Sequence, residues 1–202
     1  MNFCKTMFAL MFLFPLGMVC GQDSQMGAYE METEGNRAVL IVAPEFYSIA
    51  LYDAEDHSFV GTEGGSWRTL ADGLVEVLRE FNTLDTSTVG IREEVPVLFG
   101  DGIVAIADQE WKQIDDGSPG VLSGAWLITG RKRDGEIRRR TPGQRKTMKI
   151  LSGTRFQWIA YHIGTKVFSG SGGGTYTSEQ GKYTETIDFF SRDNDRVGAV
   201  TL

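Results

Sequence analysis

Two similar stretches of sequence decide the fold: Glu45-Phe46-Tyr47-Ser48-Ile49-Ala50-Leu51-Tyr52 returns as Arg155-Phe156-Gln157-Trp158-Ile159-Ala160-Tyr161-His162. A glycine-rich pair follows them, in which Phe59-Val60-Gly61-Thr62-Glu63-Gly64-Gly65-Ser66-Trp67 returns as Phe168-Ser169-Gly170-Ser171-Gly172-Gly173-Gly174-Thr175-Tyr176. Upstream, Gly27-Ala28-Tyr29 returns as Gly124-Ala125-Trp126. Because a repeat at a fixed period indicates that one structural unit occurs more than once, the sequence predicts two units built alike.

The residues within each unit favour β-strands. Short runs of β-branched and aromatic residues alternate with Gly, Asp and Asn at the spacing of roughly 8–12 residues that is typical of all-β sandwiches and barrels. The repeated glycines are expected to bend strands so that a barrel can curl. In the first unit we expect strands near Gly27–Thr33, Arg37–Val42, Phe46–Asp53, Ser58–Arg68, Leu74–Phe81, Thr88–Leu98, Ile103–Ala107 and Glu110–Ile114.

The boundary between the units is expected at Asp115-Asp116-Gly117-Ser118-Pro119-Gly120, a run rich in turn-forming residues. This predicts a first barrel unit over residues 22–114, a linker over 115–123 and a second unit over 124–202. Matching the repeats places Leu202 close to Glu94 of the first unit. The second unit therefore lacks counterparts of Val95–Ile114, its closing strands. Either the chain is a truncated fragment or its second barrel is open, and the sequence does not decide between them.

The first residues, 1–21, have the features of an export signal. Lys5 supplies the positive charge, and the apolar run from Met7 to Val19 is too short to cross a bilayer. We expect cleavage after Gly21, so that the mature protein is periplasmic, associated with the outer membrane or extracellular. Lipid attachment at Cys20 is the alternative, although the preceding Val19 is larger than is usual there.

Cysteine chemistry is not expected in the mature protein. Both cysteines, Cys4 and Cys20, lie in the export signal. After cleavage the chain has no thiol for a disulfide, a thiolate zinc site or a cysteine nucleophile.

The two halves of the chain carry opposite charge. Residues 22–120 contain five Lys/Arg and twenty Asp/Glu, a net charge of −15, whereas residues 121–202 contain fourteen and seven, a net charge of +7. Eight of the sixteen residues from Arg131 to Lys146 are basic and two are acidic. We expect Arg138, Arg139 and Arg140 to contact an anionic group, either on the acidic first unit or on an anionic membrane or glycan surface. A solvated loop that keeps the protein soluble is the alternative, and nucleic acid is not an expected partner of an exported protein.

Enzyme chemistry has no visible centre in this sequence. His57 and His162 lie about a hundred residues apart in positions that do not match between the units. The glycine run near Gly172 lacks the lysine of a phosphate-binding loop and the spacing of a nucleophile elbow. No nucleophile, base and oxyanion donor come together. We therefore expect a protein that is not an enzyme and that has no cofactor and no metal site.

The chain resembles a known family. The Gly124-Ala125-Trp126 stretch at the start of a first strand is similar to the Gly-x-Trp of lipocalin-like (calycin) barrels. Two longer stretches, residues 151–160 and 189–198, resemble a family of uncharacterised exported bacterial proteins with lipocalin-like domains. The resemblance covers nearly all of the mature chain. It implies an all-β fold of two tandem lipocalin-like antiparallel β-barrels and export, and it implies no activity.

Aromatic residues of the second unit are the candidate ligand site. The side chains expected to line the mouth and interior of a barrel are those of Trp126, Phe156, Trp158, Tyr161 and Tyr176. Their alternative role is to fill a small barrel completely, as side chains commonly do.

Two functions follow from these features. The first is a non-catalytic envelope or secreted binding protein that holds a small apolar or amphipathic ligand, such as a lipid, in a barrel. The second is a structural or protein-interaction module with filled barrels and a basic loop that binds an anionic surface. A filled interior with no cavity near ~300 Å³ would favour the second function, because ligand pockets begin around that size. The sequence does not predict an oligomeric state.

Overall fold

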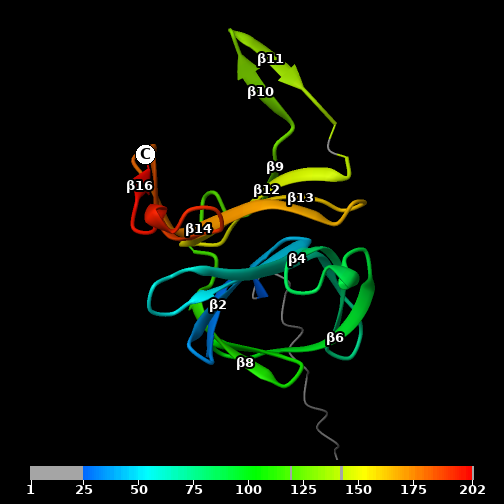
Figure 1. Cartoon of the computed structure of the whole chain (residues 1–202). Coiled ribbons are helices and arrows are strands. Elements are labelled where there is room, and N and C mark those ends of the chain that lie inside the picture. Colours follow the sequence, from blue (N-terminus) through cyan, green and yellow to red (C-terminus); the bar gives the residue numbers. More distant parts are fainter. Residues whose placement is uncertain (1–24, 119, 142, 202) are drawn as a thin grey trace, which may run out of the picture.

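The computed structural model describes residues 25–118, 120–141 and 143–201. The expected export signal lies outside the described residues. The described chain is all-β and contains one closed barrel and one open sheet (Figure 1). The predicted fold class is confirmed at this level.

The first unit is a closed antiparallel barrel in which each strand pairs with its neighbour in the sequence. Its strands are β1 (Gly27–Thr33), β2 (Asn36–Ala43), β3 (Phe46–Asp53), β4 (Phe59–Thr69), β5 (Leu74–Asn82), β6 (Arg92–Phe99), β7 (Ile103–Ile106) and β8 (Gln109–Asp115). Pairing of β1 with β8, as at Tyr29 and Gln113, closes the barrel. Alternate residues point inward and form one apolar core, which contains Tyr29, Leu40, Tyr47, Trp67, Val75, Val77, Val97, Val104 and Trp111.

The second unit is a six-stranded sheet in the order β16-β15-β14-β13-β12-β9. Its strands are β9 (Gly124–Leu127), β12 (Arg145–Leu151), β13 (Arg155–His162), β14 (Val167–Glu179), β15 (Lys182–Phe190) and β16 (Val200–Thr201). Among the described residues β9 and β16 are the edges, so this sheet does not close. Between β9 and β12, strands β10 (Gly130–Arg133) and β11 (Glu136–Arg139) form a separate two-stranded ribbon that points away from the body (Figure 1).

The two sheets share their irregular features. A register shift lies between Gly64 and Gly65 where β4 pairs with β5, and another between Gly173 and Gly174 where β14 pairs with β15. The glycines were expected to bend strands, and these shifts agree with that expectation. An added Cβ would lie 1.9 Å from the carbonyl oxygen of Leu78 at Gly65 and 2.0 Å from that of Thr186 at Gly174. Each position therefore excludes a side chain.

The registers correct the first alignment of the repeat by one residue. A register shift lies between Leu51 and Tyr52 in β3, and another between Ala160 and Tyr161 in β13. Tyr52 therefore corresponds to Tyr161, and not to His162. The physical reason is the period of two in a strand, since a slip of one residue would exchange the two faces.

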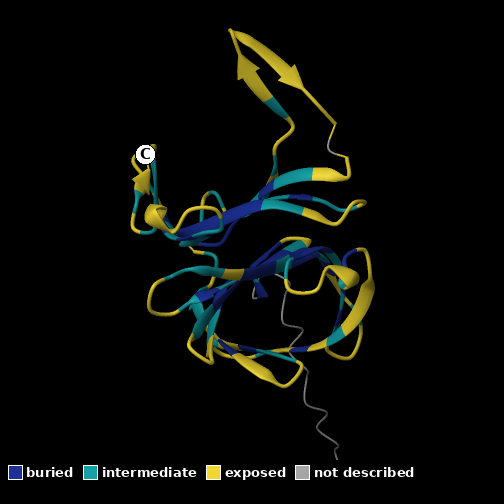
Figure 2. Ribbon diagram, in the orientation of Figure 1, coloured by how far each residue is buried: buried dark blue, intermediate teal, exposed yellow. Residues whose placement is uncertain are grey.

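The barrel and the open sheet pack face to face through one shared apolar core. From the barrel this core includes Val39, Ile41, Ala50, Tyr52 and Phe81, and from the open sheet it includes Met148, Ile150, Ile159, Tyr161 and Phe189. Figure 2 shows the buried segments concentrated along this contact and inside the barrel.

The ring contacts across this core are reciprocal. Tyr52 of the barrel stacks on Phe189 of the sheet with centroids 5.3 Å apart, and Phe81 of the barrel contacts Tyr161 of the sheet at 4.8 Å. Tyr52 corresponds to Tyr161, and Phe81 corresponds to Phe189. Such an exchange of partners is the pattern of a two-fold interface.

Polar groups also join the two units. The Glu80 carboxylate, which is 5% exposed, accepts from Lys146 Nζ at 2.7 Å and from the Tyr161 hydroxyl at 2.5 Å. Burial, and then the adjacent Glu80 carboxylate, raise the pKa of the Tyr161 phenol. The phenol therefore stays protonated and donates to Glu80.

A second polar contact fixes the joint between the units. The Asp115 carboxylate, at the end of β8, accepts hydrogen bonds from the backbone N–H groups of Gly153 and Thr154, both at 3.0 Å. It also accepts from the hydroxyls of Ser152 at 2.8 Å and Thr154 at 2.6 Å. One side chain thus ties the end of the barrel to the β12–β13 turn.

Candidate functional site

The structure separates the aromatic residues that the sequence grouped. Phe156, Trp158 and Tyr176 lie in one apolar cluster on the face of the open sheet that points away from the barrel. Tyr161 lies on the opposite face, 1% exposed, within the core between the two units. The expectation that Tyr161 lines a ligand site is therefore corrected. The alternation of β13 explains the difference, since Phe156 and Trp158 share one face and Tyr161 belongs to the other.

Trp126 borders a shallow depression rather than a pocket. Its side chain is 55% exposed, and it lines an open hollow of about 260 Å³ with Leu122, Lys149, Leu151 and Tyr183. Leu122 and residues of β9, β12 and β15 surround this open hollow. Because ligand pockets usually cover ~70–90% of a ligand's surface, an open hollow of this kind is a poor small-molecule site.

A more enclosed cavity lies inside the closed barrel of the first unit. Its volume is about 110 Å³. Its lining is Leu40, Val42, Tyr47, Ile49, Glu63, Trp67, Val75, Val77, Arg79, Val95, Val97, Phe99, Val104 and Ile106. Most of these side chains are aliphatic, and strands from β2 to β7 contribute them. The Trp67 indole N–H is already used, because it donates to the Ala43 carbonyl at 2.9 Å. Three other polar side chains, those of Tyr47, Glu63 and Arg79, therefore determine the chemistry of the cavity.

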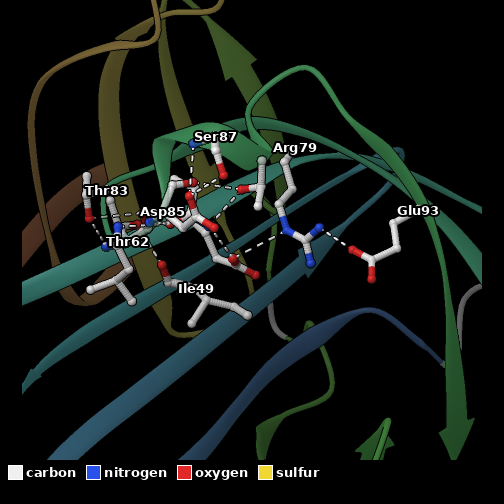
Figure 3. Close-up of polar contacts among 11 residues, drawn as sticks. Ile49, Thr62, Arg79, Thr83, Asp85, Ser87 and Glu93 are labelled. Carbon is white, nitrogen blue, oxygen red and sulfur yellow. Dashed lines mark hydrogen bonds and ion pairs between the residues drawn. The ribbon is translucent and has the colours of Figure 1, made fainter.

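These three side chains form one polar end of the cavity. Arg79 Nε lies 3.4 Å from Glu63 Oε2, and the other side of the guanidinium pairs with Glu93 (Figure 3). The Glu93 side chain is 51% exposed, so this end of the cavity reaches solvent. The Tyr47 hydroxyl forms no hydrogen bond with another residue in the described ranges, although Tyr47 itself is 9% exposed.

Asn82 holds Glu63 in position. Its Nδ2 donates to Glu63 Oε2 at 3.1 Å and to Thr88 Oγ1 at 3.1 Å. Its Oδ1 accepts from the backbone N–H groups of Leu84 and Asp85 at 2.9 and 3.0 Å. Glu63 Oε1 makes no hydrogen bond within the part of the chain that the structure describes. It remains an acceptor available to a ligand.

The electrostatics of this polar end follow from partial burial. Burial raises the pKa of Glu63, and the nearby Arg79 opposes that rise. Burial by itself would lower the pKa of Arg79, but its pairing with Glu93 and Glu63 raises it overall. Burial, and then Glu63, raise the pKa of the Tyr47 phenol. At neutral pH the Tyr47 hydroxyl is therefore neutral and can donate or accept a hydrogen bond.

The open sheet is an internal comparison for this polar end. In the register of β4 and β5, Glu63 lies opposite Asn82. At the corresponding position of β14 and β15, Gly172 lies opposite Phe190. Next to the register shift, Gly65 pairs with Arg79 and Gly174 pairs with Ile187. The same sheet geometry thus forms without the carboxylate, the amide or the guanidinium.

The basic ribbon, defined here as β10 and β11, is highly exposed. Arg138, Arg139 and Arg140 form no ion pair with another described residue. Arg140 Nε donates to the Ile128 carbonyl at 3.3 Å. In Figure 1 the ribbon points away from the barrel, so the structure does not place these arginines on the acidic first unit.

Within residues 25–118, 120–141 and 143–201, no helix is long and apolar enough to span a membrane. The same residues contain no group of three or more His, Cys, Asp or Glu side chains arranged to hold a metal ion. No family model, curated protein or solved structure matches this chain.

Proposed function

We propose that this chain is a non-catalytic binding protein whose closed barrel holds a small apolar or amphipathic ligand. The observation that carries the proposal is the apolar cavity of about 110 Å³ with Tyr47, Glu63 and Arg79 at its polar end. An apolar wall with a few polar groups that fix orientation is the usual composition of a small-molecule site.

The volume of the cavity limits which class of ligand fits inside the barrel. It is smaller than the ~300 Å³ at which drug-sized pockets begin, which by size alone favours the filled-barrel alternative and weighs against a whole lipid molecule. The polar side chains at one end of the apolar lining are what favour a ligand site. An engineered apolar cavity of about 150 Å³ binds benzene. A compact ring is therefore the ligand class that fits the barrel best.

Filling the cavity tests this proposal. Val95 lines the cavity and is partly buried, so Val95→Phe adds volume where a neighbouring side chain has room to adjust. We expect the wild-type protein to bind toluene in isothermal titration calorimetry, and Val95→Phe to weaken that binding at least about tenfold, because the space is taken.

The matched control is Val200→Phe, which adds the same ring at an exposed strand position outside the barrel. It is expected to bind toluene as the wild type does. If toluene does not bind to the wild type, or if it binds equally well to Val95→Phe, the barrel is not the site.

We also propose that the two units are tandem lipocalin-like copies in an exported protein. An eight-stranded barrel whose strands pair in chain order is the architecture of lipocalins. Matching register shifts and reciprocal ring contacts support descent of both units from one copy.

A second candidate function is binding of an anionic membrane or glycan surface by the basic ribbon. The observation that favours it is that Arg131 lies directly opposite Arg138 in the ribbon. Like charges at opposed strand positions are destabilising, and a bound anion would remove that repulsion.

Vesicle binding tests the second function. Replacing Arg138, Arg139 and Arg140 with Gln is expected to weaken cosedimentation with phosphatidylglycerol vesicles at low salt, with a loss that shrinks as salt screens the field. The control replaces Lys166, Lys182 and Arg196 with Gln, three exposed positions on the second unit outside the ribbon. If both variants lose vesicle binding equally, or if neither loses it, the ribbon does not bind the membrane specifically and only keeps the protein soluble.

A further inference from the structure

We propose that the barrel cavity selects small apolar ligands that carry a cationic amino group and discriminates against those that carry a carboxylate. This inference rests on the proposed ligand site in the barrel. It assigns a charge class to the ligand from the arrangement of Tyr47, Glu63, Arg79 and Glu93.

The charge balance at the polar end favours a cation. Two carboxylates, Glu63 and Glu93, share one guanidinium, that of Arg79, so this end has one negative charge in excess. A ligand carboxylate would add a second negative charge beside Glu63, where low solvent exposure weakens screening. An ammonium group would instead neutralise the excess.

The hydrogen-bonding groups that remain free at the polar end also favour a cationic ligand. Glu63 Oε1 and the Tyr47 hydroxyl have no hydrogen-bond partner within the described residues. Arg79 is ion-paired with Glu63 and Glu93, although its buried Nε forms no hydrogen bond with a described residue. A ligand carboxylate has only acceptors and would find no donor at Glu63 Oε1. An ammonium group has three donors and satisfies both free groups.

The ring walls add a further attraction for a cation. Tyr47 and Trp67 both line the cavity, and their side chains are on neighbouring strands β3 and β4. A cation within about 6 Å of such a ring face is attracted by its quadrupole. The aliphatic wall formed by residues such as Val97 and Val104 remains available for the apolar body of the ligand.

The charged groups of the polar end occur in only one of the two units. At the same register the open sheet has Gly172 and Ile187 in place of Glu63 and Arg79. Burying charges is costly, so partly buried charges that the second unit lacks at the same register support a role in binding.

The test compares three ligands with the same ring and different head groups: toluene, benzylamine and benzoate. Isothermal titration calorimetry at low salt is expected to give binding at least about tenfold tighter for benzylamine than for toluene, because a charge-assisted hydrogen bond forms, and weaker binding for benzoate than for either. Glu63→Gln is expected to bring the ratio of benzylamine to toluene affinity down to about one. Tyr47→Phe is expected to lower the same ratio, because it removes the hydroxyl at nearly constant volume.

The control is Glu76→Gln, a carboxylate of β5 that pairs with Arg68 and Arg92 outside the cavity, and it is expected to leave the ratio unchanged. If benzoate binds as tightly as benzylamine, or if Glu63→Gln leaves the ratio unchanged while toluene still binds, the charge assignment is wrong and the barrel site stands. If none of the three ligands binds, the proposed function itself fails.

Discussion

Replacing Glu80 with Ala is expected to lower the free energy of unfolding by about 3–5 kcal/mol, the cost of breaking a buried ion pair from one side. The substitution leaves Lys146 Nζ and the Tyr161 hydroxyl without their acceptor in the contact between the two units. Neither group has another hydrogen-bond partner among the described residues. Urea denaturation of wild type and variant measures the difference.

Glu94→Ala is the control for this prediction, because Glu94 is an exposed carboxylate of the same barrel. Its urea midpoint is expected to match that of the wild type. Equal stability of Glu80→Ala and wild type would show that Lys146 and Tyr161 find other partners, and that this cluster does not hold the units together.

The second large effect is expected at Asp115. Asp115→Ala leaves the backbone N–H groups of Gly153 and Thr154 without their acceptor, together with two hydroxyls of the same turn. Hydrogen bonds to a charged group contribute about 1.5–3 kcal/mol each, and water can replace part of what is lost at a partly buried turn. We expect a loss of roughly 3 kcal/mol in the free energy of unfolding.

The neighbouring Asp116 is a close control, because its carboxylate accepts one backbone hydrogen bond, from Ser118 at 3.0 Å, and none from the described residues of the second unit. Asp116→Ala is expected to be much milder than Asp115→Ala in the same denaturation experiment. Equal effects of the two substitutions would mean that Asp115 acts only within its own turn.

Local sequence patterns predicted the strands of the first unit well. The expected strands Gly27–Thr33 and Phe46–Asp53 have the bounds of β1 and β3. The largest difference is at the strand expected from Thr88, since β6 begins at Arg92. There the Asp85 side chain caps a short 3₁₀ turn over Thr86–Thr88, and a side-chain cap of this kind competes with strand pairing.

Contacts between distant segments could not be predicted in the same way. The alternation of β13 predicts which residues share a face, but not which face meets the barrel. That choice depends on a second sheet, and it places Tyr161 in the shared core. The shared core also shows why the two units are not independent of each other.

Sequence patterns did not predict the polar end of the cavity, because Tyr47, Glu63 and Arg79 lie on three different strands, β3, β4 and β5. Glu63 lies among glycines that predict bends in the strand, and Arg79 follows sixteen residues later. Comparison of the two repeats does indicate this site. Where the first unit has Glu63, the second has Gly172, and a charge at an inward position of only one copy indicates a specific role.

The most direct test of this account is a crystal structure of the protein soaked with toluene. The account predicts electron density for one ring inside the closed barrel, in contact with Leu40, Val97 and Val104. Density for the ring only on the open sheet, beside Trp126 and Tyr183, or an empty barrel at saturating toluene, would contradict it.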